Sequence, residues 1–286
     1  MLIDLHAHST ASDGTDDPGA LVRAAAAAGL DVIAITDHDT TAGWASALAA
    51  RPAGLTVVRG AEFSCVYEAP GAHGVNLHLL GYLFDPAHPG LLAEQGKQHD
   101  ARTARARRMV ARLVADGYPI SWQQVEELAA GGPVGRPHVA RALVQAGVAP
   151  SVDAVFADLL AHTSTYHVGK RNTDVLEMIR LIRDAGGVTV FAHPLAWRRG
   201  PVVDDAAIRT MTEAGLQGIE RDHPDHDAES RAHIAALGGE LGLVLTGASD
   251  YHGSNKTHND LGICTTSTES YEALLAFGTA LPPVSD

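Results

Sequence analysis

Short apolar runs that end in a histidine or an acidic residue constrain the fold of this chain more than any other feature. The runs at 2–6, 31–36 and 188–191 have the composition of buried strands, and helical patterns such as that at 17–29 lie between such runs. Strands that alternate with helices predict parallel βα units. About seven such runs fit a closed barrel better than an open sheet. We therefore expect an α/β fold built on a (β/α) barrel.

Residues 91–164 interrupt this alternation with helical sequence. The part at 91–117 predicts one long, arginine-rich helix, and three shorter helices follow it between glycine and proline breaks. The βα pattern then resumes. We therefore expect a barrel domain formed by 1–90 and 165–286, and a helical insertion subdomain at 91–164 that covers the active site.

The bulk composition narrows the classes of partner and location. The 286 residues carry a formal net charge of -13, so the surface as a whole repels nucleic acid and anionic membranes, and a nucleotide ligand needs a local basic pocket. The two cysteines, Cys65 and Cys264, are too few for a disulfide framework, which suits a reducing compartment. The chain shows neither a signal-peptide pattern nor an apolar run of about 18 residues, so we expect a cytoplasmic protein without a membrane span.

Two pairs of metal-ligand side chains follow the strand-like runs with a spacing of two. His6 and His8 form one pair, and Asp250 and His252 form the other. Residues two apart on a strand point to the same side, so each pair presents two ligand groups together. A core rarely buries two imidazoles side by side without a partner, whereas a metal ion suits them well.

Further histidines and acids occupy equivalent places along the chain. In a barrel of parallel strands, the carboxyl ends of the strands meet on one face, where these side chains would converge. Imidazoles and carboxylates without thiolates favour Zn²⁺, Mn²⁺ or Fe²⁺. The set exceeds what one ion needs, so we expect two or three divalent ions, with Mn²⁺ favoured and Fe²⁺ or Zn²⁺ as alternatives. The candidate ligands are His6, His8, Asp13, His38, Glu62, His78, His193, Asp250 and His252.

Six sequence motifs occur in the order found in one enzyme family. They are DLHAHSTASDGT (4–15), AITDHDT (34–40), GAEFS (60–64), HLLGY (78–82), FAHP (191–194) and SDYHG (249–253). The chain thereby resembles the PHP (polymerase and histidinol phosphatase) family of phosphoesterases over nearly its whole length. The insertion motifs ARTARARRM and GRPHVARAL resemble the branch of nucleoside 3',5'-bisphosphate phosphatases and 5'-3' exoribonucleases. The resemblance implies the PHP fold, a distorted (β/α)7 TIM-like barrel, with a trinuclear metal centre.

The resemblance also implies how the ligands divide among three ions. The first ion would take four ligands, namely His6, His8, Glu62 and Asp250. The second would share Glu62 and be completed by His78 and His193. The third would take Asp13, His38 and His252. His73 competes with His78, because the segment after Glu62 looks longer than usual, but we prefer His78 because it lies inside the strand-like motif.

These inferences predict a metal-dependent phosphoesterase that hydrolyses the 3'-phosphate of nucleoside 3',5'-bisphosphates through a metal-bridging hydroxide. The same kind of site could trim short RNA as a 5'-3' exonuclease. We expect His193, Asp13 and Asp250 to act in catalysis. The insertion and the loop after it supply the side chains that we expect to bind substrate phosphates, which are Arg102, Arg105, Arg136, His138 and Lys170.

Three other functions stay open on the sequence alone. Histidinol phosphate phosphatase is a different branch of the same superfamily, but a substrate with one phosphate and a cationic amine needs fewer cations. A non-catalytic, metal-stabilised PHP module and a metalloamidase on a similar barrel are the other two. We expect a small nucleotide, and secondarily short RNA, as the ligand, and no protein partner. The sequence gives no role to Glu220 and Arg221 or to the segment DHPDHD at 222–227.

Overall fold

One curved sheet forms the centre of the molecule. The computed structural model describes residues 1–69, 73–129, 132, 134–161 and 163–286. Seven strands follow one another around the sheet in the order β1-β2-β3-β4-β6-β7-β8, and the short strand β5 pairs with β3. Their bounds are Ile3–Ala7 (β1), Val32–Ile35 (β2), Thr56–Tyr67 (β3), Val75–Tyr82 (β4), Thr173–Asp174 (β5), Val188–Phe191 (β6), Gly218–Asp222 (β7) and Val244–Gly247 (β8).

The first and last strands meet just beyond their ends, which nearly closes the sheet into a barrel. Ala7 of β1 pairs in parallel with Tyr251, which follows β8, and the His8 N–H donates to the Tyr251 carbonyl at 2.8 Å. This arrangement confirms the expected α/β fold, a distorted, TIM-like barrel of seven strands.

The expectation of parallel βα units throughout was wrong for one strand. Strand β4 pairs antiparallel with both β3 and β6, so the barrel is mixed rather than wholly parallel. Only seven residues (68–74) separate β3 from β4. A parallel crossover needs about a dozen residues or more, so a link of this length can only make a hairpin.

Alternate residues of the strands face two separate apolar cores. Val32 and Ala34 pack inside the barrel, whereas Ile33 and Ile35 pack toward the surrounding helices. A strand that is buried on both faces in this way reads as a continuous apolar run. Helix α10 (Thr268–Leu275) contributes side chains to the inner core, so it packs against the barrel interior.

Local sequence sets where the barrel helices begin. The Asp17 carboxylate accepts hydrogen bonds from the N–H groups of Gly19 and Ala20, and Pro18 occupies the first position of α1 (Pro18–Ala27). Both features satisfy or avoid N–H groups that a helix start leaves without partners. The other barrel helices are α2 (Trp44–Ala49), α7 (Val175–Asp184), α8 (Asp205–Glu213) and α9 (Ala228–Leu241).

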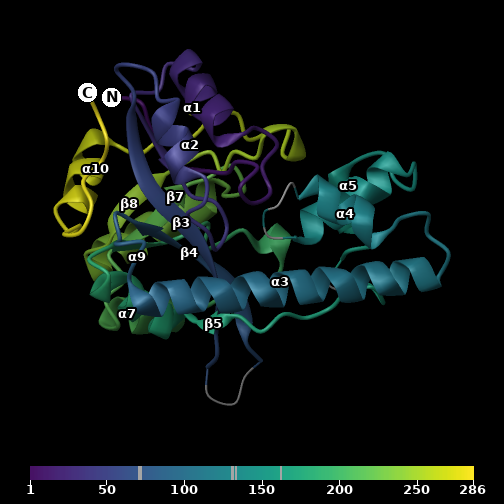
Figure 1. The fold of residues 1–286 in the computed structure, drawn as a ribbon. Helices are drawn as coiled ribbons and strands as arrows, with labels where there is room; N and C mark the ends of the chain where they lie inside the picture. Colours follow the sequence, from purple (N-terminus) through teal and green to yellow (C-terminus); the bar gives the residue numbers. More distant parts are fainter. Residues whose placement is uncertain (70–72, 130–131, 133, 162) are drawn as a thin grey trace.

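Helices α3 (Pro89–Ala115), α4 (Trp122–Leu128), α5 (Arg136–Gln145) and α6 (Val152–Ala157) form an arm beside the barrel (Figure 1). The long helix α3 links the two parts. Its residue Leu91 belongs to the outer core of the barrel, whereas Met109 and Leu113 belong to a separate apolar cluster with α4, α5 and α6. The arm therefore has a core of its own. Residues 130, 131, 133 and 162 of the predicted insertion lie outside the described residues.

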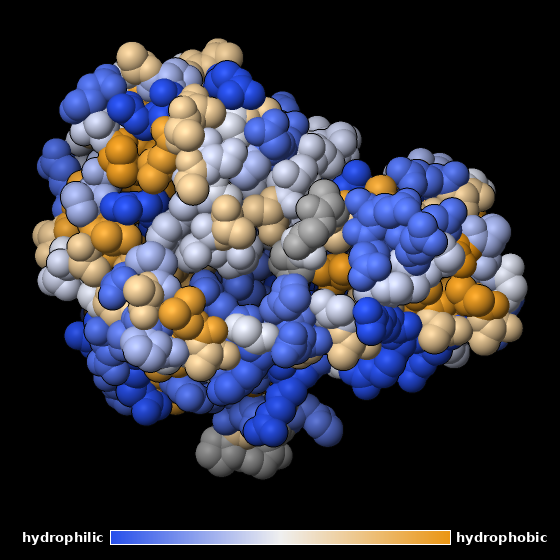
Figure 2. All heavy atoms as spheres, viewed as in Figure 1, coloured by the Kyte–Doolittle hydropathy of each residue, from blue (hydrophilic) through white to orange (hydrophobic). Residues whose placement is uncertain are grey.

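The space-filling view shows hydrophilic side chains in the hollow where the arm meets the barrel (Figure 2). The expectation of no membrane span fits the structure so far as it is described: none of the helices there is long and apolar enough to cross a bilayer.

Candidate metal centre

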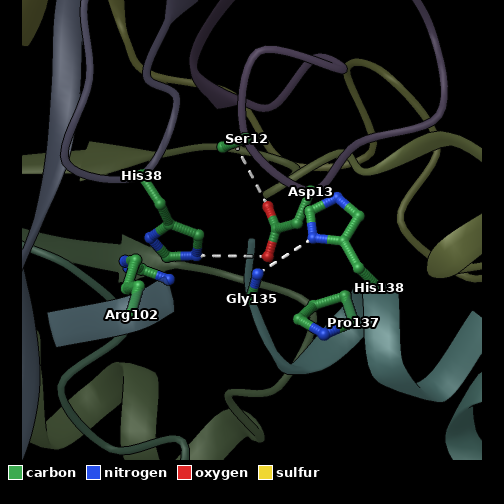
Figure 3. Close-up of a pocket in the computed structure, with 7 residues that line it drawn as sticks. All are labelled: Ser12, Asp13, His38, Arg102, Gly135, Pro137 and His138. Atoms are coloured by element: carbon green, nitrogen blue, oxygen red, sulfur yellow. Dashed lines mark hydrogen bonds and ion pairs between the residues drawn. The ribbon is translucent and has the colours of Figure 1, made fainter. Parts of the chain in front are cut away.

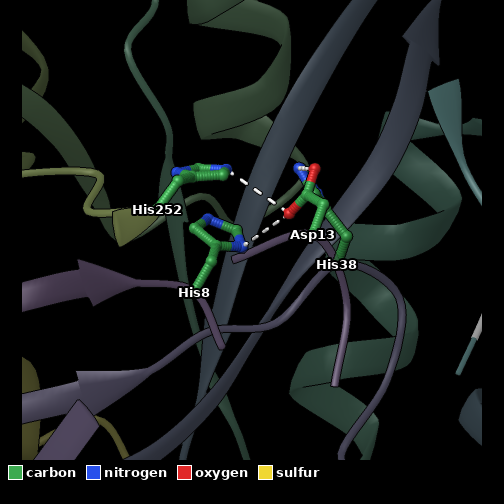
Figure 4. Close-up of side chains that lie close together, drawn as sticks. All are labelled: His8, Asp13, His38 and His252. Atoms are coloured by element: carbon green, nitrogen blue, oxygen red, sulfur yellow. Dashed lines mark ion pairs between the residues drawn. The ribbon is translucent and has the colours of Figure 1, made fainter. Parts of the chain in front are cut away.

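The expected ligands gather at the mouth of the barrel. His6, Glu62 and His78 lie in strands β1, β3 and β4, and the others lie in loops that directly follow strands. All of them are buried except His78, which is half-buried, and His73 is exposed in the loop before β4. Figure 4 shows one part of this cluster, where side chains from three separate segments turn toward one another.

Four ligand atoms form a compact first group. His6 Nε2 lies 3.0 Å from His8 Nε2, and Glu62 Oε2 lies 3.2 and 3.1 Å from these two nitrogens. Asp250 Oδ1 lies 3.4 Å from each of them. A tetrahedron of ligands about 2.0 Å from a central ion has edges of about 3.3 Å. The spacing of these atoms therefore fits one enclosed divalent cation.

Glu62 also connects a second group of ligands. Its Oε1 lies 2.7 Å from His78 Nδ1 and 3.0 Å from His193 Nε2. Its Oε2 lies 3.2 Å from Nδ1 of His38. One carboxylate thus faces imidazoles of two groups through different oxygens, which is the geometry of a bridging ligand.

Asp13 is the centre of the third group (Figure 4). Its Oδ1 lies 3.4 Å from His252 Nε2 and 3.7 Å from His8 Nδ1, and its Oδ2 lies 3.6 Å from His38 Nε2. His8 and His38 each present their second ring nitrogen here. The third group therefore shares His8 and His38 with its neighbours, whereas the predicted division had Glu62 as the shared ligand.

The carboxylates and imidazoles of the cluster shift one another's pKa values. Burial alone would raise the pKa of Glu62, but the facing imidazoles, chiefly those of His78, His38 and His6, hold that pKa well below its usual value. Burial lowers the pKa of His193 well below its usual value, and Arg199 adds to this effect. Burial alone would lower the pKa values of His6 and His8, but facing carboxylates raise the pKa of His8 to about 9 and that of His6 well above its usual value. A cation that binds to these two rings would therefore displace protons.

Three buried ring nitrogens, Nδ1 of His8, His38 and His78, lie near carboxylate oxygens of Asp13 or Glu62 but form no hydrogen bond among the described residues. Buried polar atoms in native proteins are almost always paired, so each of these needs an explanation. Divalent cations would provide the missing partners. The donor types, their spacing and these nitrogens together fit a centre of divalent metal ions.

A group of cations from the arm and the loop after it lies next to the third group. Arg102 Nε donates to Asp39 Oδ2 at 2.7 Å, its Nη2 donates to Ser64 Oγ at 2.7 Å, and Lys170 Nζ lies 3.9 Å from the same Asp39 oxygen. Arg105 and Arg136 form no ion pair with a carboxylate of the described residues, and Arg105 Nε is buried without a partner. We call these four residues the arm cations.

The pKa values of two arm cations, Arg105 and Lys170, indicate positive charge that carboxylates do not fully compensate. Burial lowers the pKa of Arg105 to about 9, and repulsion by Arg102 and Arg136 adds to the shift. Burial likewise lowers the pKa of Lys170 to about 7, against the opposing attraction of Asp39. Such a cluster favours an anionic ligand, because an anion would remove the repulsion.

A small pocket lies where the arm meets the metal centre (Figure 3). Ser12, Asp13 and His38 line it from the barrel, and the arm contributes Arg102, Gly135, Pro137 and His138. His138 Nδ1 accepts the Gly135 N–H at 3.0 Å, so this ring nitrogen supports the start of α5. The pocket joins two proposed metal ligands to one of the arm cations.

Two cations at the site were missed by the sequence analysis. Arg199 Nη2 lies 2.8 Å from Asp250 Oδ2, and Lys256 Nζ lies 2.5 Å from the same oxygen. Both follow strand-end motifs by a few residues, at the loops after β6 and β8, and that position was the signal available in the sequence. Asp250 therefore faces the imidazoles of His6 and His8 with Oδ1 and these two cations with Oδ2.

The DHPDHD segment supports the loops around Asp250. His223 Nε2 lies 3.3 Å from Asp250 Oδ2, and Asp225 Oδ2 accepts from Arg199 Nε at 2.5 Å. His226 Nε2 accepts the Leu195 N–H at 3.2 Å. These residues hold neighbouring loops in place, and Arg221 pairs locally with Asp222 through Nε at 2.9 Å.

Comparison with known proteins decides the family. The sequence model of the PHP domain matches residues 4–182, which is more than half of the chain. This chain belongs to the PHP family. It is accordingly a hydrolase of phosphate esters that binds divalent metal ions, and the His, Asp and Glu clusters at its barrel mouth have the spacing to hold them.

Several enzymes are similar to this PHP protein over most of their length. A 3',5'-nucleoside bisphosphate phosphatase of Chromobacterium violaceum is 32% identical, covering 91% of this chain and 90% of its own. A 5'-3' exoribonuclease of Haemophilus influenzae is 34% identical, covering 87% and 89%. A phosphoribosyl 1,2-cyclic phosphate 1,2-diphosphodiesterase of Eggerthella lenta is 35% identical, covering 88% and 95%. All three names denote enzymes that cleave phosphate esters, but the substrates that they name differ.

Two solved structures share the fold. A Bifidobacterium adolescentis protein, assigned by prediction as a metal-dependent phosphoesterase, is 33% identical with a TM-score of 0.90, covering 97% of this chain and 96% of its own. An amidohydrolase from Chromobacterium violaceum, solved with bound sulfate and no metal, is 30% identical with a TM-score of 0.84, covering 98% of each chain. At this coverage, both likenesses include the arm as well as the barrel.

Replacement of Glu62 tests the metal centre. Glu62→Gln should lower the number of Mn²⁺ ions bound per chain and the Mn²⁺-induced rise in Tm, because a neutral amide cannot bridge two cations with two charged oxygens. Elemental analysis after dialysis and thermal melts with and without Mn²⁺ measure these effects. Glu240→Gln, which removes an exposed partner of Arg209, is the control. Equal metal content in both variants would contradict the assignment.

Proposed function

We propose that this PHP protein removes the 3'-phosphate from nucleoside 3',5'-bisphosphates. The observation that carries the proposal is the set of arm cations beside the metal centre, joined to it by the pocket of Figure 3. One phosphate of such a substrate would meet the metal ions and the other would meet the arm cations. A site for a simple monoester needs only the first of these.

The charge balance of the arm cations favours a dianionic group. Asp39 is the carboxylate that pairs with Arg102 and Lys170, which leaves Arg105 and Arg136 without one among the described residues. Arginine binds phosphate through two parallel N–H groups, so these side chains suit a terminal phosphate. The chain as a whole is acidic, with a net charge of -13, and such a local basic group is therefore the place where an anion would bind.

The residues of the metal centre have separate roles in the proposed reaction. When bound, divalent ions would supply Lewis acidity and activate a water molecule for attack on phosphorus. Arg199 and Lys256 would compensate charge on the phosphate oxygens from the side of Asp250. Burial alone would raise the pKa of Asp13, but the imidazoles of His38 and His252 have the larger effect and hold this pKa well below its usual value. Asp13 therefore acts as an acceptor or ligand, not as the acid that protonates the leaving oxygen.

His193 and Asp250 complete the proposed catalytic set with Asp13. His193 Nε2 faces Glu62, and the low pKa of this imidazole, which burial causes, keeps it neutral. Asp250 presents Oδ1 to the first group while Arg199 and Lys256 hold Oδ2. This division fixes the orientation of the carboxylate, which a productive site requires.

Exonuclease activity on short RNA is the second candidate. The relative named as an exoribonuclease supports it, and a 5'-phosphorylated RNA end would offer the arm cations the same terminal phosphate. Histidinol phosphate has one phosphate and a cationic amine, so the arm cations disfavour it. A non-catalytic module would not need the arm cations. A cyclic phosphodiester is also tested, because the relative from Eggerthella lenta is named as a cyclic phosphate diphosphodiesterase.

A substrate panel tests the proposal. We expect Mn²⁺-loaded protein to release phosphate fastest from adenosine 3',5'-bisphosphate, with 5'-AMP as the product, because this substrate alone combines a 3'-monoester with a second phosphate. The other substrates are AMP, histidinol phosphate, a 5'-phosphorylated oligoribonucleotide and a 1,2-cyclic ribose phosphate. Higher kcat/KM for any of these would replace the proposed substrate by the one preferred.

Arg105 should separate bisphosphates from monoesters. Arg105→Met should lower kcat/KM for the bisphosphate by about 10- to 100-fold, since a hydrogen bond to a charged group contributes about 1.5–3 kcal/mol, and should change a 3'-monophosphate much less. Arg108→Met alters an exposed arginine of the same helix and should leave both substrates unchanged. An equal loss on both substrates would count against a role in binding the second phosphate.

Anion binding should weaken as Lys170 loses its proton. Below pH 7, Lys170 is charged with or without a bound anion, so the affinity for the anion is constant. Above its pKa of about 7, the lysine must take up a proton when the anion binds. The affinity for the anion then falls by up to about tenfold per pH unit. Sulfate is the probe because it stays a dianion over this range. Calorimetry of the Mn²⁺-loaded protein from pH 6 to 9 should show the fall in wild type and a flatter, weaker profile in Lys170→Met. If sulfate affinity fell with pH equally in wild type and in Lys170→Met, Lys170 would not be the group that titrates.

A further inference from the structure

Glu220 is a fully buried carboxylate that the proposed reaction does not use. It lies in β7, which β8 separates from β1 around the barrel, and its side chain is buried. Burying a carboxylate is unfavourable unless both oxygens find partners. The identity of those partners therefore indicates what the residue does.

The two oxygens of Glu220 contact two different proposed metal ligands. Oε1 lies 3.2 Å from His6 Nδ1, and Oε2 accepts the backbone N–H of His193 at 2.7 Å. His6 belongs to the first group of ligands and His193 to the second. The φ angle of His193 is 31°, a value that residues other than glycine seldom adopt, so its backbone needs an external constraint.

We propose that Glu220 is a positioning residue that aligns His6 and His193 together, and so couples the geometry of two metal sites. Accepting the Nδ1–H of His6 fixes the tautomer in which Nε2 carries the lone pair. That nitrogen is the one that faces His8, Glu62 and Asp250. Histidine ligands of metal ions commonly donate their other ring N–H to a carboxylate in this way, and losing that partner weakens metal binding.

Glu220 is not placed as a ligand itself. Its Oε1 faces the ring edge of His6 opposite to the shared metal position, and none of the three ligand clusters among the described residues contains Glu220. Its contact with His193 is to the backbone, whereas the ring of His193 faces Glu62. The carboxylate therefore acts through the two histidines.

The site requires two acceptors, which distinguishes glutamate from glutamine. The amide of Gln would offer one acceptor oxygen and one N–H donor group. Whichever way that amide turns, its donor would face either the Nδ1–H of His6 or the N–H of His193. Glu220→Gln preserves size and shape and removes the alignment of one of the two histidines.

Mn²⁺ affinity is the readout, since the inference rests on the proposed ligand set and not on the substrate. Glu220→Gln should weaken binding of Mn²⁺ by about 10- to 100-fold and still reach the wild-type stoichiometry at saturation. Glu94→Gln is the matched control: Glu94 is also buried and accepts hydrogen bonds from Gln98 Nε2 at 3.1 Å and Lys97 Nζ at 3.0 Å, but it contacts none of the proposed metal ligands. It should lower the Tm of the metal-free protein and keep wild-type Mn²⁺ affinity.

Three outcomes would overturn the proposal. They are wild-type Mn²⁺ affinity in Glu220→Gln, an equal loss in Glu94→Gln, and a missing metal equivalent at saturation, which would make Glu220 a ligand. Wild-type protein that binds no Mn²⁺ would overturn the metal centre itself. If Glu220→Gln does not fold, nitrogen NMR of the Zn²⁺-loaded wild type decides: a proton on His6 Nδ1 supports the proposal, and a proton-free Nδ1 refutes it.

Discussion

The rest of the structure depends on the convergence of imidazoles on the buried carboxylate of Glu62. Its oxygens lie between 2.7 and 3.2 Å from nitrogens of His6, His8, His38, His78 and His193. A carboxylate in such a place keeps its charge only if positive charge surrounds it. The partners come from four strands or their loops besides β3, so the barrel must be nearly closed before the charge is compensated. The same contacts with Glu62 therefore require the nearly closed barrel and form the proposed metal centre.

The arm and the barrel contribute opposite charges to the same place. The barrel mouth supplies carboxylates and imidazoles, which bind metal cations, whereas the arm cations favour an anion. Metal ions and a phosphorylated ligand together would satisfy both. Arg102 connects the two parts, because it leaves the arm helix α3 to pair with Asp39 beside the metal ligand His38. The pocket that Arg102 and Asp13 line lies on this boundary, so a ligand there would contact both parts.

The sequence predicted the barrel and the family, because strand-like runs and ordered motifs are local signals. The seven-residue link before β4 was also visible, and attention to its length would have predicted the antiparallel strand. The roles of Glu220, Arg199 and Lys256 were not predictable in this way. A position near a strand end does not say which side chain a residue will contact, and the contact of Glu220 in β7 with His6 in β1 joins segments far apart in the sequence. The division of the ligands among ions stays a prediction, and the shared use of His8 and His38 makes it less simple than motifs imply.

Backbone strain at the barrel mouth follows from the same demand for convergence. Asp39, His193 and Asp250 adopt φ angles of 55°, 31° and 53°, and such conformations cost about 1–3 kcal/mol each. All three follow strand ends, where an extended continuation would carry the side chains away from the cluster. Contacts hold each of them: Asp39 receives Arg102 and the Ser64 N–H, His193 is fixed by Glu220, and Asp250 by Arg199 and Lys256. At His193 and Asp250, the residues that hold the strained segments are thus Glu220, Arg199 and Lys256, to which the sequence analysis gave no role.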